Sequence, residues 1–318
     1  MVLIDLEQEI TLNYTDLFED LKIIELDNDS DVLVSEVNDV LITEERIIIL
    51  DKRLSEAIHF YDMNGKLINS IKADKGPEVF TSPSEFVLIN RDTEVLVSDA
   101  MSFITYYYDL DGNYLRQVNT NEFGISSIAN FSEDIYAVSI YQDDWKKKIE
   151  IRKSQDLSFQ KFVDIEDELE FKMIAGHSSS IFKNSHNDHV YFTQKFHPKI
   201  IEIKNGQIEN SYFFKFSNSN FDYLKDETYQ MIDVYKTIQQ KKLNALTGNL
   251  VASSQYIFAN FISSKDQFNR TFLFDTKSRK SFVLEGLTND MDIVMKSSRS
   301  LLSYPVRNKY LAYSYYPS

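Results

Sequence analysis

Residues 61–68 read YDMNGKLI, and residues 108–115 repeat that phrase as YDLDGNYL, 47 residues further along the chain. Each copy closes one β-favouring run, turns at an Asx-Gly pair and opens a second run, which is the pattern of two strands joined by a tight hairpin. A strand–turn–strand unit that recurs every 40–50 residues or so indicates a β-propeller or a β-solenoid.

Short apolar runs separated by turn residues group into further units of the same kind, each of them an antiparallel meander. These runs are rich in Phe, Tyr, Ile and Val, which favour the pleated surface of a sheet. We expect five such units, over residues 46–71, 85–118, 127–163, 180–214 and 249–284.

Three more runs lie near the ends of the chain, at residues 21–26, 300–304 and 310–315. We expect them to form a sixth blade in which the N-terminal strand pairs with the C-terminal strands, because closing the ring in this way protects an exposed sheet edge. The prediction is therefore an all-β, six-bladed β-propeller of four-stranded antiparallel blades, with residues 1–318 in a single domain.

One segment departs from the strand pattern. Residues 221–243 contain no Gly or Pro, and their apolar residues recur roughly at helical spacing. Asp222 could cap the helix that this spacing predicts. We expect a helical insertion between the fourth and fifth blades.

Composition narrows the class of partner. The chain carries 49 Asp and Glu against 34 Lys and Arg, a formal net charge of −15, which repels phosphate backbones and argues against a nucleic-acid partner. It has no cysteine, so disulfides and thiolate metal sites are excluded.

No run approaches the roughly 18 apolar residues of a transmembrane helix. The first residues do not read as an export signal, so we expect either a cytoplasmic protein or an exported one whose leader lies before Met1.

The first third of the chain resembles a known family. Residues 17–26 (LFEDLKIIEL), 47–52 (IIILDK), 58–66 (IHFYDMNGK) and 76–78 (GPE) are similar to the opening segment, first blade and blade-to-blade turn of six-bladed propellers of exported bacterial proteins, which are related to the NHL-repeat propellers. The resemblance covers residues 4–118. Beyond these residues, the chain matches the family only in the spacing of its expected strands. It implies a propeller that is often an exported lipoprotein, and it brings no catalytic residues with it.

The two repeated turns also contain the start of a calcium-loop pattern, with Asp62 and Asn64 in one and Asp109 and Asp111 in the other. Alternating side-chain oxygens of this kind can bind calcium, but both loops lack the acidic residue that closes an EF-hand loop. A hairpin needs the same Asx-Gly residues to reach positive φ. We therefore interpret both as hairpin turns.

Four of the five histidines lie between His177 and His197, and His186 and His189 are three residues apart. Three imidazoles could bind zinc. A strand edge does not bring histidines at this spacing together, however, so the sequence favours ordinary surface histidines.

In a propeller, the blade-to-blade loops and the loops between second and third strands gather on one face, around the mouth of the channel. Trp145 is the only tryptophan, and it lies in a polar loop where an aromatic side chain could serve as a platform for a ligand. From these loops we select Arg53, Glu85, Asp99, Trp145, His197 and Arg270 as candidate ligand-binding residues, and Asp39 and Glu85 as candidate metal ligands.

The sequence contains no nucleophile elbow, phosphate-binding loop or dinucleotide fingerprint. The predicted function is therefore non-catalytic binding of a protein, peptide or glycan ligand at the channel mouth, without a cofactor. The alternative is a metal-dependent, lactonase-like hydrolase with calcium or zinc in the channel, which fold analogy alone suggests. We expect a monomer in the periplasm or at the outer-membrane surface of a Gram-negative bacterium, with any lipid anchor ahead of Met1, or alternatively in the cytoplasm.

Overall fold

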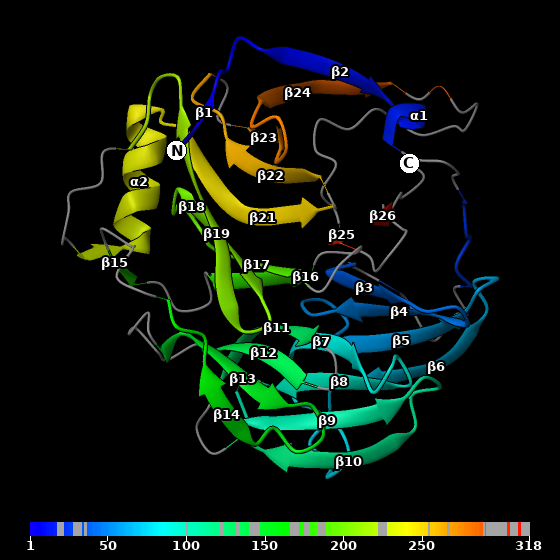
Figure 1. Cartoon of the computed structure of the whole chain (residues 1–318). Coiled ribbons are helices and arrows are strands. Elements are labelled where there is room, and N and C mark those ends of the chain that lie inside the picture. The colour runs from blue at the N-terminus through cyan, green and yellow to red at the C-terminus, as the bar shows by residue number, and fades with distance from the viewer. Residues whose placement is uncertain are drawn as a thin grey trace. The chain divides into compact units, whose positions relative to one another are not determined.

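The computed structural model describes most of the chain (Figure 1). The described residues are 1–17, 22–27, 34, 37–99, 101–120, 124–131, 134–139, 147–165, 172–174, 179–183, 189–221, 228–253, 255–265, 268–288, 290, 304–305 and 311–312. They belong to two compact units: unit 1 comprises Met1–Lys22, Ile165–Ser303 and Tyr313–Ser318, and unit 2 comprises Ile23–Asp164 and Tyr304–Ala312.

Unit 2 contains three four-stranded antiparallel sheets, which we call blades 1, 2 and 3. Blade 1 consists of β3 (Asp39–Ile42), β4 (Arg46–Asp51), β5 (Ala57–Asp62) and β6 (Leu67–Lys72). Blade 2 consists of β7 (Pro83–Ile89), β8 (Glu94–Asp99), β9 (Ile104–Asp109) and β10 (Tyr114–Asn119). Blade 3 consists of β11 (Ile125–Phe131), β12 (Asp134–Ser139), β13 (Ile149–Lys153) and β14 (Phe159–Phe162).

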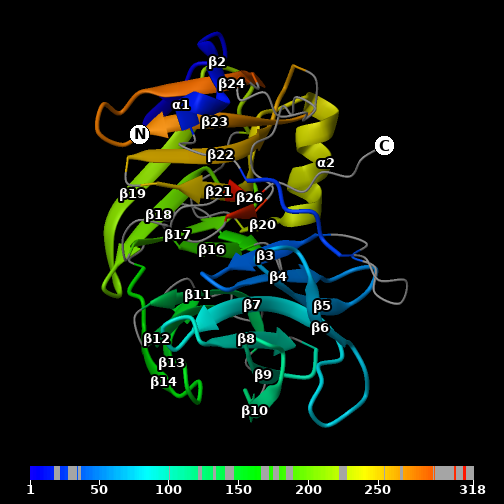
Figure 2. The same ribbon diagram turned by 90° about the vertical axis from the view of Figure 1, so that its right-hand side faces the viewer.

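The three blades of unit 2 lie one against the next (Figure 2). Phe60 of blade 1 packs in one buried cluster with Phe86 of blade 2, and Leu96 of blade 2 packs in another with Ile135 of blade 3. Because the middle strands are covered on both faces, β4 reads as the continuous apolar run 47–50 rather than as an alternating strand. Outer strands such as β10 alternate between exposed and partly buried residues.

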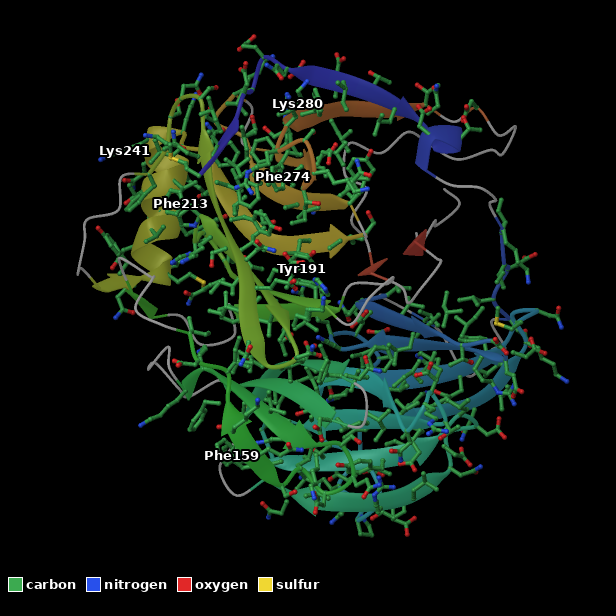
Figure 3. The ribbon with its side chains drawn as sticks, viewed as in Figure 1. Phe159, Tyr191, Phe213, Lys241, Phe274 and Lys280 are labelled. Atoms are coloured by element: carbon green, nitrogen blue, oxygen red, sulfur yellow. The ribbon has the colours of Figure 1, made fainter. Side chains whose placement is uncertain are left out.

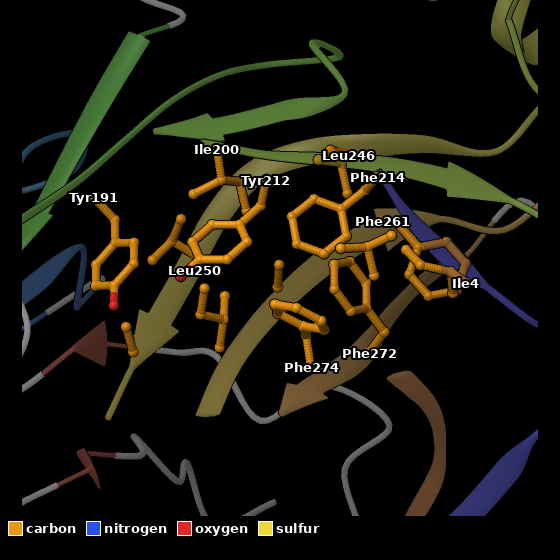
Figure 4. Close-up of a cluster of buried hydrophobic side chains, with 14 of the residues drawn as sticks. Ile4, Tyr191, Ile200, Tyr212, Phe214, Leu246, Leu250, Phe261, Phe272 and Phe274 are labelled. Carbon is orange, nitrogen blue, oxygen red and sulfur yellow. The ribbon is translucent and has the colours of Figure 1, made fainter. Parts of the chain in front are cut away.

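Unit 1 contains two more sheets of the same kind, blades 4 and 5. Blade 4 consists of β16 (Ser179–Lys183), β17 (His189–Gln194), β18 (Lys199–Lys204) and β19 (Gln207–Phe216). Blade 5 consists of β21 (Ala245–Ala252), β22 (Tyr256–Ile262), β23 (Asn269–Asp275) and β24 (Ser281–Thr288). A cluster of aromatic side chains joins them (Figure 4), in which Tyr212 and Phe214 of blade 4 contact Phe274 of blade 5.

The all-β propeller of four-stranded antiparallel blades is thus confirmed, but the prediction of six blades is wrong: the described residues form five. Within the described ranges, the N-terminal segment does not pair with the C-terminal strands β25 (Tyr304–Pro305) and β26 (Leu311–Ala312). Instead β1 (Val2–Ile4) adds in parallel to β19, and β2 (Glu9–Asn13) adds in parallel to β24, as Figure 1 shows. Val2 and Ile4 are buried in the aromatic cluster, so burial of apolar side chains favours this pairing.

The other parts of the expected sixth blade also differ. Residues 22–26, the described part of the expected N-terminal strand, contain no strand. Near the C-terminus, β25 and β26 form a two-stranded antiparallel ribbon, with β25 beside β3. These strands are too short to make a blade.

The expected helix is present but shorter than predicted. The helix α2 (Met231–Lys241) follows the short strand β20 (Thr228–Gln230), which pairs in parallel with β15 (Lys172–Ile174). Its N-cap residue is Gln230, whose side chain makes no capping hydrogen bond. Asp222, the cap expected from the sequence, lies outside the described residues. Val234 and Ile238 are its buried residues. The other described helix is α1 (Tyr14–Leu17), and neither has the length and hydrophobicity needed to cross a membrane.

The repeated turns are hairpins, as predicted. In both, an aspartate side chain accepts hydrogen bonds from two backbone N–H groups of its own turn: Asp62 Oδ1 from Asn64 and Lys66, and Asp109 Oδ1 from two residues of its turn. Gly65 and Gly112 have φ of 84° and 79°. The aspartates therefore close the turns.

Candidate functional site

Three charged residues that are separated in the sequence come together at one end of blades 1 and 2. Asp39 begins β3, Lys52 follows the last residue of β4, and Glu85 lies near the start of β7; these strands are labelled in Figure 1. The antiparallel register places the start of a first strand beside the end of a second strand, because Asp39 pairs with Leu50. We call Asp39, Lys52 and Glu85 the acid–base cluster.

An ion pair lies at the centre of the cluster. Lys52 Nζ is 2.8 Å from Glu85 Oε1, and the two side chains are 30% and 21% exposed. The backbone N–H of Lys52 donates to Asn38 Oδ1 at 2.6 Å, and the N–H of Val40 donates to Asp39 Oδ1 at 2.8 Å. These backbone contacts fix the two charged residues of blade 1 close to Glu85 of blade 2.

The cluster changes the acidity of its members. Burial, together with the nearby negative charge of Glu85, raises the pKa of Asp39 from 3.8 to about 7, against the opposing effects of Lys52 and the Val40 N–H. For Lys52, burial tends to lower the pKa, but Glu85 and Asp39 outweigh it, so the pKa lies above 10.5. Near neutral pH, Lys52 is therefore a cation and Asp39 is present in both its protonated and ionised forms.

Arg53 and Asp99 lie at the same end of unit 2 but differ in exposure. Arg53 is exposed in the loop between β4 and β5, next to Lys52. Asp99 is buried at the end of β8 and accepts hydrogen bonds from the backbone and hydroxyl of Thr81 and from the N–H groups of loop residues such as Ser102. Burial tends to raise the pKa of Asp99, but these hydrogen bonds outweigh it, and the pKa is lowered. Asp99 therefore holds two loops in place.

The remaining sequence candidates lie in unit 1 or outside the described residues. His197 is buried in the loop between β17 and β18. Arg270 lies in β23, and its Nη1 donates to Glu9 Oε1 of β2 at 2.9 Å, so it ties the added N-terminal strand to blade 5. Trp145 lies outside the described residues.

Of the candidates chosen from the sequence, the structure brings Asp39 and Glu85 together, with Arg53 nearby. Sequence reasoning missed Lys52, although it lies next to Arg53 in the loop that was selected. Its role depends on a contact with the next blade, and no local pattern signals that contact. Among the described residues, a group of three side chains whose ligand atoms are close enough for one metal ion consists of His189, Glu202 and Glu209, in blade 4.

Two solved structures of similar fold come from Bacteroides species. One is a Bacteroides fragilis protein that is described, by presumption, as exported. It has 16% sequence identity to this chain and a TM-score of 0.65, and the match covers 89% of this chain and 79% of that chain. The second, from Bacteroides vulgatus, is a member of the DUF4221 family, with 12% identity and a TM-score of 0.55, over 80% of this chain and 85% of that chain. At such identities the likeness shows the fold alone.

No curated protein matches the sequence. A family model does match it, over nearly its whole length, from residue 2 to residue 318. The chain therefore belongs to the family described as the domain of unknown function DUF4934.

Proposed function

We propose that this propeller is a non-catalytic binding protein, and that a ligand of the protein, peptide or glycan class contacts the end of unit 2 where the acid–base cluster lies. The supporting observation is the cluster itself: two carboxyl groups and an ammonium from two blades meet where both Lys52 and Glu85 keep partial contact with solvent. Charged groups held in fixed positions at the rim of a sheet can orient a polar ligand without reorganising.

The chemistry of the cluster suits a ligand that both donates and accepts hydrogen bonds. Lys52 and the exposed Arg53 supply donors, Glu85 supplies an acceptor, and Asp39 can act as either near neutral pH. The neighbouring Leu54 is 69% exposed and adds an apolar contact. Sugar hydroxyls and peptide groups have this mixed character.

The alternative, a metal-dependent hydrolase with Glu85 as a ligand, gains no support from this geometry. The ammonium of Lys52 already faces Glu85 at 2.8 Å, so a metal ion at Glu85 would have to displace it.

We place the protein in the cell envelope of a Gram-negative bacterium, in the periplasm or at the outer-membrane surface. The support is the name of the Bacteroides fragilis protein of the same fold, which presumes export. A lipid anchor, and the relation to NHL-repeat propellers that the first third of the chain suggests, stay predictions.

Binding to glycan arrays and to soluble envelope extracts of a Bacteroides species tests the proposal. We expect binding to fall by tenfold or more in the Arg53→Ala and Lys52→Ala variants. Lys66→Ala is the matched control, because Lys66 is exposed in the β5–β6 hairpin at the opposite end of blade 1. Thermal melting separates loss of binding from loss of fold. If the protein binds a ligand and all three variants bind it as the wild type does, the proposed surface is wrong.

A further inference from the structure

Blade 4 carries a charged residue where the other blades carry apolar ones. In every blade, the third residue of the second strand pairs with a residue of the third strand. In blades 1, 2, 3 and 5 that partner is Phe60, Tyr107, Ile151 and Leu273, whereas in blade 4 it is Glu202. Glu202 is only 5% exposed, and burying a carboxylate is costly unless charged or hydrogen-bonding groups surround it.

Four side chains of blade 4 bind the Glu202 carboxylate. His189 Nδ1 lies 2.5 Å from Oε1, and the Tyr191 hydroxyl donates to the same oxygen at 3.0 Å. The Tyr212 hydroxyl and Asn210 Nδ2 both donate to Oε2 at 2.8 Å. Burial tends to raise the pKa of Glu202, but these four contacts outweigh it and the pKa is lowered. Both tyrosine rings belong to the aromatic cluster that Figure 4 shows, which anchors the arrangement.

A β-bulge places a second carboxylate beside the same histidine. Glu202 pairs with Asn210 and Ile203 pairs with Ile208, so Glu209 is the extra residue of β19. Bulges redirect a side chain and are frequent beside functional sites. Blade 3 has the same bulge at Gln160, whose Nε2 donates to Oδ1 of Asp134, the first residue of its second strand, at 2.6 Å.

His189 is the corresponding first residue in blade 4. Its Nε2 lies 3.4 Å from Glu209 Oε2, which is longer than the ordinary N–H···O hydrogen bond. Two ligands bound tetrahedrally to one zinc ion, each at about 2.1 Å, are about 3.4 Å apart. The other oxygen of Glu209 faces Lys204 Nζ at 3.8 Å, and both side chains of that pair are 40% or more exposed, so the pair contributes little to stability.

We propose that His189 Nε2 and Glu209 Oε2 are protein ligands of a zinc ion in blade 4, with Glu202 as the carboxylate that orients the histidine through Nδ1. A carboxylate–histidine–metal arrangement of this kind fixes the ring and raises the basicity of the ligand nitrogen. Two protein ligands leave the remaining positions to water or to a donor group of a partner. This site is independent of the acid–base cluster in unit 2.

Titration of the metal-free full chain with Zn²⁺ alone, measured by calorimetry, tests the proposal. We expect one zinc ion per chain in the wild type, loss of binding in His189→Gln, and affinity at least about tenfold weaker in Glu209→Gln. Glu202→Gln should weaken binding about 10–100-fold, as removal of an outer-shell carboxylate does. The matched control, Glu45→Gln, changes an exposed glutamate of unit 2 and should bind as the wild type.

Because Glu202 is buried, its variant could unfold, whereas Glu209 is 40% exposed and its variant should melt as the wild type does without metal. A crystal soaked in Zn²⁺ should show an anomalous peak within about 2.1 Å of both ligand atoms. The proposal is overturned if the wild type binds no zinc, if zinc binding is unchanged in both His189→Gln and Glu209→Gln, or if the peak lies elsewhere.

Discussion

Lys52 Nζ lies 2.8 Å from Glu85 Oε1, and this single ion pair links the end of β4 in blade 1 to β7 in blade 2. Both side chains are partly shielded from water, so the pair should contribute more than an exposed one. A double-mutant cycle with Lys52→Met and Glu85→Gln should give a coupling free energy of about 1 kcal/mol in urea unfolding, decreasing with added salt.

The pair Arg46–Asp111 serves as the control, because it also joins blades 1 and 2 but its aspartate is 50% exposed. Its cycle, with Arg46→Met and Asp111→Asn, should give about 0.5 kcal/mol or less. A coupling for Lys52 and Glu85 that does not exceed this value would contradict the interpretation.

Asp39 should make stability depend on pH. Because folding raises its pKa from 3.8 to about 7, the folded chain binds more protons than the unfolded chain between these values, and stability is lost as pH rises from about 4 to 7. A pKa shift of this size corresponds to a decrease of roughly 4 kcal/mol in the free energy of unfolding. Since the Asp39 side chain keeps some solvent contact, we expect about half of that decrease.

The Asp39→Asn variant removes this cost. It should be about 2 kcal/mol more stable than the wild type at pH 8 and equally stable near pH 4, measured by urea unfolding across this range. Asp74→Asn, at an aspartate that is exposed in a loop of the same unit, is the matched control. A difference between Asp39→Asn and the wild type that does not change with pH would show that Asp39 ionises normally.

Much of the fold could be predicted from the sequence, because a blade is specified locally. The alternation of apolar runs and turns fixes four antiparallel strands, and the Asx-Gly pairs at Asn64 and Asp111 mark two of the hairpins. The number of blades is not specified locally. Whether the N-terminal segment adds residues 21–26 to a sixth blade or Val2 and Ile4 to β19 depends on the free energies of two distant pairings, which no short window of sequence contains.

The same limit applies to the candidate sites. Asp39 and Glu85 could be selected because both lie in the segments expected to form the loops around the channel mouth. Lys52 and Glu209 could not, since one acts on the next blade and the other is redirected by a bulge. Apolar periodicity predicts which face of a strand is buried, but it does not predict the one-residue shift that turns Glu209 toward His189.

Gly65 should tolerate no side chain. Its φ is 84°, and a Cβ atom there would lie 1.9 Å from the backbone oxygen of Glu25. Gly65 also accepts a hydrogen bond from the Asp27 N–H at 2.7 Å through its carbonyl oxygen, so the neighbouring segment cannot move away without losing it. Gly65→Ala should therefore cost about 3 kcal/mol, from left-handed strain and overpacking together.

Urea unfolding of Gly65→Ala and Gly286→Ala measures this effect. Gly286 lies in β24 and no atom is within 4 Å of a Cβ built on it, so its alanine variant should stay within about 0.5 kcal/mol of the wild type. Similar losses in the two variants would mean that the close approach to Glu25 does not constrain the fold.

His197 should make the protein sensitive to acid. Burial, with a smaller effect of the Lys199 charge, lowers its pKa from 6.5 to about 3. Its Nδ1 accepts the Lys199 backbone N–H at 3.1 Å, so the proton of the neutral ring is assigned to Nε2. Because the unfolded chain takes up a proton near pH 6.5 and the folded chain does not, stability falls as pH decreases from about 6.5 toward 3, by about 2 kcal/mol between pH 7 and pH 5.

The His197→Gln variant keeps hydrogen-bonding capacity and cannot titrate, so its stability should fall less steeply over the same range, whatever its stability at pH 7. NMR titration of the His197 ring in the wild type gives a direct measurement, and the ring should stay neutral down to about pH 4. A titration midpoint near 6.5, or equal acid slopes in the two proteins, would show that this loop opens to water below neutral pH and that the burial of His197 is not maintained.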